Sequence, residues 1–63
     1  MLIHVYSDFR NFEYSANVIP KVDEFLYFPH FGTYKAKKII YNISDDSNNN
    51  KIIFVEIFAD KVN

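Results

Sequence analysis

The sequence predicts an all-β protein, a small five-stranded antiparallel sheet that is strongly bent or closed into a barrel. Apolar residues alternate with polar ones, or gather in short runs rich in Ile, Val, Phe and Tyr, and helical periodicity is weak throughout. The turn residues are few: the only glycine lies close to one of the two prolines, between two such runs. The alternation in a lysine-rich segment also reverses its phase, which is typical of a bent strand.

The length of the chain limits the number of domains and the size of the core. A chain of 63 residues forms one domain, residues 1–63, and a domain of this size hides only roughly 60 % of the surface that its unfolded chain exposes. The absence of cysteine excludes disulfides and thiolate zinc sites and favours an intracellular origin. Dense aromatic packing or self-association must therefore supplement the core.

The first half of the chain contains three expected strands, at residues 2–6, 9–14 and 24–28. In the second of them, Phe12 and Tyr14 lie on one face. Pro20 cannot donate a hydrogen bond to a sheet, so residues 17–22 form a loop or begin a strand. The run PHFG at residues 29–32 predicts a hairpin turn in which Gly32 takes a positive φ at no steric cost.

The fourth expected strand, residues 33–43, contains the phase reversal. Tyr34 and Ala36 are apolar between lysines, whereas Ile39, Tyr41 and Ile43 form the apolar set further along. One extra residue near Lys37 and Lys38 explains the reversal as a β-bulge, which bends a strand and lets a small sheet curl. The alternative is a strand buried on both faces.

Seven polar residues, SDDSNNN at 44–50, predict an exposed hairpin loop before a last strand at residues 51–60. The loop lacks the glycine and the terminal glutamate of an EF-hand, so we expect no metal site and no cofactor. Both faces of the last strand are largely apolar. It is therefore central in the sheet, or its second face meets a partner.

The stretches IPKVDEFLYF and TYKAKKIIYNI resemble the SH3-like small β-barrels of short bacterial and phage accessory proteins. In that family a proline, two residues, a glycine and an acid precede an apolar strand, and a tyrosine then begins a lysine-rich bent strand. Pro20, Glu24, Tyr34 and residues 35–38 follow this outline within residues 18–59, and Asp23 stands where glycine is usual. The resemblance implies a barrel and no particular function, because such barrels host many functions.

Enzymatic function is not expected. The only histidines, His4 and His30, fall in a strand and a turn, without a nucleophile and carboxylate in an evident triad pattern. The net charge of −1 argues against binding driven by phosphate charge. We find no signal peptide and no apolar run long enough to cross a bilayer, and we expect a cytoplasmic protein.

The five tyrosines and seven phenylalanines exceed what one small core encloses, so several rings must lie at the surface and mark a binding site. The hypothesis is a protein-binding module, and the sharpest version is a phage or mobile-element inhibitor that blocks a host defence enzyme sterically, as an anti-CRISPR protein does. Its expected contact residues are Tyr27, Phe28, Phe31 and Tyr34. One alternative is a nucleic-acid-binding barrel that uses Lys35, Lys37, Lys38 and Tyr41, and another is a homodimeric structural protein.

Overall fold

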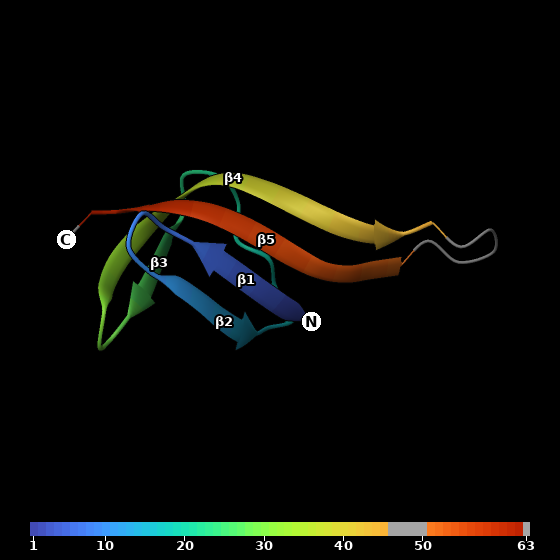
Figure 1. The fold of residues 1–63 in the computed structure, drawn as a ribbon, viewed down its shortest axis with the longest axis horizontal. Coiled ribbons are helices and arrows are strands. Elements are labelled where there is room, and N and C mark those ends of the chain that lie inside the picture. The colour runs from blue at the N-terminus through green and yellow to red at the C-terminus, as the bar shows by residue number, and fades with distance from the viewer. Residues whose placement is uncertain (46–50, 63) are drawn as a thin grey trace.

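A computed structural model describes residues 1–45 and 51–62 as one curled sheet of five strands (Figure 1). The strands are β1 (Leu2–Tyr6), β2 (Asn11–Ser15), β3 (Phe25–Phe28), β4 (Gly32–Ser44) and β5 (Lys51–Lys61), in the spatial order β2-β1-β5-β4-β3. The sheet curls into a half-barrel, which confirms the predicted all-β, strongly bent fold. It is compatible with a small β-barrel.

One strand pair departs from the antiparallel expectation. β1 pairs with β5 in parallel, with Ile3 opposite Val55 and Val5 opposite Ile57, whereas the other three pairs are antiparallel. Each antiparallel pair is formed by strands consecutive in the chain, but no short turn joins β1 to β5 and fixes their relative direction. The pairing places β5 in the centre of the sheet, as its two apolar faces predicted.

The core lies on the concave face and is made of alternate residues of the three middle strands. The buried set is Ile3, Val5, Tyr34, Ala36, Val55, Ile57 and Ala59, and half-buried apolar side chains from β2, β3, β4 and the β2–β3 loop pack against it. Because side chains alternate between faces along a strand, the residues between these positions face outward on the convex side. The fold therefore has one filled face and one solvent-facing face.

Contacts between aromatic side chains connect the two edges of the sheet. β2 and β3 lie at opposite ends of the strand order, yet the rings of Phe12 and Phe28 stack with centroids 4.2 Å apart and planes 7° from parallel. Tyr34, from β4, meets both rings edge-on at 5.1 and 5.7 Å. Ring packing rather than a ladder of strand hydrogen bonds thus joins these two edges across the concave face.

The predicted bulge is confirmed. The register of β4 against β5 shifts between Ala36 and Lys38, so that Lys37 is the extra residue. Before the bulge, Tyr34 and Ala36 face the core, and after it Ile39 packs against the core instead. A second shift lies between Asn42 and Ile43, where Ile53 of β5 is the extra residue. These irregularities let the β4–β5 pair bend with the curled sheet.

Asp23 explains why this chain can do without glycine before β3. Its φ is 75°, in the left-handed region where aspartate is among the better tolerated residues other than glycine. The Asp23 backbone N–H donates to the carbonyl oxygen of Ala36 at 2.8 Å, and Lys35 Nζ lies 3.7 Å from Asp23 Oδ1. The position that commonly carries glycine therefore has the backbone conformation that glycine favours.

Replacing Gly32 with valine is expected to lower the free energy of unfolding by about 1–2 kcal/mol, because a β-branched side chain is strained at positive φ. Gly32 has a φ of 107° at the first position of β4, directly after the turn from β3, which confirms the predicted conformation. Urea denaturation followed by circular dichroism measures the loss. Thr33→Val, one position later in β4, is the control and is expected to change little; equal losses in both variants would contradict the explanation.

The predicted polar loop at 44–50 joins β4 to β5, and residues 46–50 of this loop lie outside the described residues. In the described segments, 1–45 and 51–62, none of the structure is a helix of the length and hydropathy that a membrane crossing requires.

Candidate functional site

The surface carries most of the aromatic side chains, as the sequence predicted. Tyr34 is the only one of the five tyrosines and seven phenylalanines that is buried, at 3 % exposure. Half of them are exposed: Phe9, Phe25, Tyr27, Phe31, Tyr41 and Phe58. The remaining rings are half-buried. The question is therefore where these rings gather on the surface.

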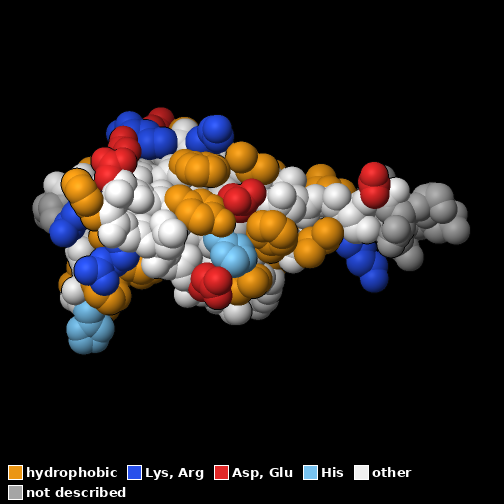
Figure 2. Space-filling model, viewed as in Figure 1, with side chains coloured by type: hydrophobic (Ala, Val, Ile, Leu, Met, Phe, Trp, Pro, Cys, Tyr) orange, Lys and Arg blue, Asp and Glu red, His pale blue; other side chains and the backbone are white. Residues whose placement is uncertain are grey.

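The densest gathering lies on the convex face over the middle of the sheet. Strand register places three outward-facing rows side by side across β1, β5 and β4: Leu2, Phe54 and Asn42; His4, Glu56 and Ile40; Tyr6, Phe58 and Lys38. Glu13 on β2 extends the middle row beside His4. Figure 2 shows this face, with apolar side chains surrounding acidic ones and a histidine. We call His4, Tyr6, Glu13, Phe54, Glu56 and Phe58 the convex patch.

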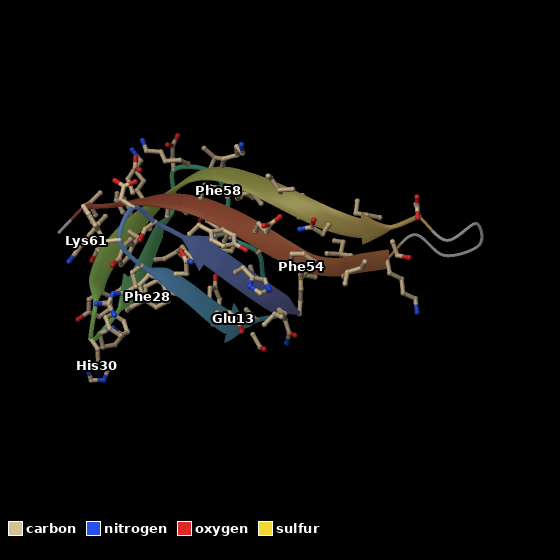
Figure 3. All side chains as sticks on the ribbon, in the orientation of Figure 1. Glu13, Phe28, His30, Phe54, Phe58 and Lys61 are labelled. Atoms are coloured by element: carbon tan, nitrogen blue, oxygen red, sulfur yellow. The ribbon has the colours of Figure 1, made fainter. Side chains whose placement is uncertain are left out.

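Ring contacts hold the convex patch together. Phe58 stacks on Tyr6 at a centroid distance of 5.2 Å, and Phe54 meets His4 edge-on at 5.1 Å. The His4 and Tyr6 rings lie nearly parallel, 6.4 Å apart. Phe54 and Phe58 both project from β5, and Figure 3 shows them along that strand with Glu13 nearby on β2. The aromatic surface is thus supported by the most central strand of the sheet.

Two carboxylates give the patch its negative charge. Glu56 Oε1 accepts a hydrogen bond from Asn42 Nδ2 at 3.1 Å, and Glu13 Oε1 lies 3.4 Å from His4 Nδ1. Desolvation, followed by the hydrogen bond to Glu56 and the negative charges of Glu56 and Glu13, raises the pKa of the Tyr6 hydroxyl above its ordinary value of 10.0. Tyr6 therefore stays a neutral hydrogen-bond donor at physiological pH.

One basic residue borders the patch. The Lys38 ammonium lies over the Phe58 ring, 5.0 Å from its centroid, as in a cation–π contact. Glu56 accepts its hydrogen bond from Asn42 rather than from a lysine. Glu13 is exposed on the opposite, histidine-bearing side of the patch.

The four residues predicted to bind protein do not form one surface. Tyr27 is 69 % exposed on β3, but Tyr34 is buried and Phe28 is half-buried in the concave core. Phe31, at the β3–β4 turn, is covered in part by the Arg10 guanidinium, whose carbon lies 4.2 Å from the ring centroid. Phe28, Phe31 and Tyr34 converge on Phe12 rather than on solvent.

The basic segment is also dispersed. Lys35 approaches Asp23, Lys37 occupies the bulge, and Lys38 lies over Phe58. Tyr41 is exposed further along β4, beyond the residues that pair with β3. The bulge and these separate contacts give the three lysines different surroundings.

Two hollows among the described residues are small. One of about 290 Å³ lies at the end of the half-barrel and is lined by two bases and two acids, Arg10, Lys61, Asp8 and Asp60, among others. Another of about 270 Å³ is lined by Tyr14, Leu26, Tyr27 and Phe28. Small-molecule sites usually measure roughly 300–1,000 Å³. Among residues 1–45 and 51–62, no group of three or more His, Asp or Glu side chains is arranged to hold a metal ion.

The chain was compared with models of protein families, with curated proteins and with solved structures. None of the three comparisons finds a match. The geometry of the convex patch, rather than likeness to a characterised protein, is therefore the basis for inferring a function.

The sequence alone indicated the outward direction of some residues of the convex patch but not their arrangement. The two apolar faces of residues 51–60 predicted a strand that is central or whose second face meets a partner, and β5 is central in the sheet. His4 and Tyr6 alternate with the buried Ile3 and Val5, so their outward direction was also readable. What placed them beside Phe54 and Phe58 is the parallel pairing of β1 with β5, for which the sequence has no local signal.

Proposed function

We propose that the protein is a non-enzymatic module that binds another protein through the convex patch. The observation that carries the proposal is the contiguous set of partly exposed rings on the solvent-facing side of the central strands. Aromatic side chains held on a rigid sheet lose little conformational freedom on binding, and aromatic residues are enriched among the energetically dominant contacts of protein interfaces.

The chemistry of the patch defines the partner that suits it. Glu56 lies between the rings, and Glu13 lies at the rim, so the patch presents carboxylates within an apolar surface. A partner segment with an arginine or lysine flanked by apolar side chains complements both features. Its cation meets the carboxylates and the ring faces, while its apolar side chains cover the rings.

Selection from a random peptide display library on the immobilised protein tests this proposal. We expect selected peptides to be enriched in Arg or Lys next to aromatic or aliphatic residues. Calorimetry with a selected peptide is expected to show about 30-fold weaker binding to Phe58→Asp, the loss typical of an energetically dominant contact. Glu56→Lys is expected to weaken binding at least as much, because it places like charges together.

Tyr27→Asp is the matched control, since Tyr27 is exposed on another strand and outside the patch. We expect it to bind the peptide as the unmodified protein does. Loss of binding in Tyr27→Asp but not in Phe58→Asp would move the site to β3 and contradict the proposal. Thermal unfolding of each variant separates a local loss of binding from a loss of structure.

Steric inhibition of a host defence enzyme by a phage or mobile-element protein is the more specific form of this proposal, with the convex patch as the docking surface. A rigid, small sheet with an exposed aromatic face is suited to occluding a basic substrate channel. The SH3-like resemblance belongs to the same proposal. It is supported by the left-handed backbone of Asp23 and the bulge at Lys37, while the parallel β1–β5 pair departs from the antiparallel sheet that we expected.

A further inference from the structure

β4 and β5 continue together past the ends of the other three strands and form a projecting two-stranded arm (Figure 1). The pairing of β3 with β4 ends at Phe25 and Lys35, and backbone bonds from residues 23 and 24 reach only as far as Ala36. From residue 38 to residue 44, β4 pairs with β5 alone. The opposite edge of this segment therefore presents backbone N–H and C=O groups without a neighbouring strand among the described residues.

The side chains along this edge are unusually apolar for an exposed strand. Ile40, Tyr41 and Ile43 are exposed, the last two at 47 % and 55 %. The chain as a whole exposes 4659 Å², whereas a compact monomer of 7.5 kDa exposes about 4,200 Å². An apolar, open strand edge on an extended domain is a surface on which another strand can add.

The sequence along this β4 edge is complementary to a second copy of the same edge that runs in the opposite direction. In an antiparallel pairing of two copies centred on Tyr41, Ile39 stands opposite Ile43, and Lys38 stands opposite Ser44. The apolar residues thus meet in the middle, and the exposed Lys38 meets a small polar side chain at each end. Members of each pair are an even number of positions apart, so both direct their backbone groups the same way, as an antiparallel ladder requires.

We propose that two copies of this chain associate through antiparallel pairing of their β4 edges about a two-fold axis at Tyr41. The two half-barrels then share one continuous ten-stranded sheet. Isologous symmetry makes every cross-strand contact away from the axis occur twice, so the Ile39–Ile43 pair forms on both sides of the axis. The Ile39, Tyr41 and Ile43 side chains of both copies form one apolar strip on the concave side.

The other open surfaces suit a second copy less well. The outward residues of the β2 edge are Asn11, Glu13 and Ser15, which offer no apolar strip. The convex patch would bring Glu13 and Glu56 of one copy toward the same carboxylates of the other, and like charges repel. Dimerisation through β4 therefore leaves the convex patch free, and the two proposals can succeed or fail independently.

Sedimentation equilibrium over a dilution series up to about 1 mM, the concentration at which even a weak complex of about −4 kcal/mol is half formed, tests the association. We expect the mass to rise from 7.5 kDa toward twice that value. Tyr41→Lys is expected to abolish the dimer, because two ammonium groups then face each other at the axis. Tyr41→Phe is expected to retain it.

A charge at Ser44 tests the register. Ser44→Lys places an ammonium group opposite Lys38 of the other copy on both sides of the axis and is expected to weaken the dimer about tenfold at low salt. Ser44→Asp places a carboxylate at the same position and is expected to strengthen the dimer. Ser44 is only half-buried at the last position of β4, so both variants keep the fold, which circular dichroism verifies.

Two results would overturn the proposal. One is a mass that stays at a single chain at every concentration. The other is a dimer that tolerates Tyr41→Lys, or whose affinity is the same in Ser44→Lys and Ser44→Asp, because association would then use another surface or another register. Phe58→Asp is expected to leave the dimer unchanged, which separates this result from the test of the convex patch.

Discussion

Replacing Ile57 with alanine is expected to lower the free energy of unfolding by about 3 kcal/mol, the usual loss when a fully buried isoleucine leaves a cavity. Ile57 is 0 % exposed and lies on the central strand, opposite Val5 on one side and Ile39 on the other. A small domain has little stability to spare, because its total is on the order of 5–15 kcal/mol or less. Urea denaturation followed by far-ultraviolet circular dichroism measures the change.

Ile53→Ala provides a control of the same chemistry on the same strand. Ile53 precedes Ile57 on β5 and is 59 % exposed, because β1 begins its pairing with β5 only at Phe54. We expect its removal to cost less than about 1 kcal/mol, since little apolar area leaves the core. Comparable losses in the two variants would show that the concave face is not the core.

Replacing Phe28 with alanine is expected to cost about 2–3 kcal/mol, somewhat below the value for a fully buried phenylalanine because Phe28 is only half-buried. The loss has a particular structural consequence. Phe28 stacks on Phe12 and meets Tyr14 and Tyr34 edge-on, and these contacts join the two edges of the sheet. Without them, we expect faster amide hydrogen exchange in β2 and β3 than in β5.

Tyr27→Ala is the matched control for Phe28→Ala, because the two residues are adjacent on β3 and face opposite sides. Tyr27 is 69 % exposed, so its removal is expected to change stability by less than about 0.5 kcal/mol. Near-ultraviolet circular dichroism, which reports packed rings, should weaken in Phe28→Ala far more than in Tyr27→Ala. If exchange in β2 stays slow in Phe28→Ala, the half-barrel is closed by other contacts.

Aromatic excess was the most informative property of the composition. It predicted that rings would remain at the surface, and the structure has one buried ring among the tyrosines and phenylalanines. It did not predict which ones. Phe31 and Tyr34 flank a turn and appeared suited to binding, but the curl of the sheet directs them toward Phe12. The phase reversal predicted the bend, but which rings the curl brings together depends on contacts between distant strands, and a linear pattern does not contain those contacts.

The lysine-rich segment also shows which features neighbouring residues determine and which features the fold determines. Its phase reversal identified the bulge, because alternation is a property of neighbouring residues. The environment of each lysine depended on what the fold brought near it: Asp23 beside Lys35, and Phe58 beneath Lys38. Lysines that are neighbours in the sequence therefore have different contacts in the structure.

The sequence by itself determined the all-β class, the five strands to within a few residues, the positive φ of Gly32 and the bulge at Lys37. Each of these follows from side-chain alternation or backbone sterics within a few positions of the chain. Only the tertiary structure decided that β1 pairs with β5 in parallel and that Phe12 meets Phe28. Those contacts join segments far apart in the chain, and the summed burial of the whole core selects among such pairings.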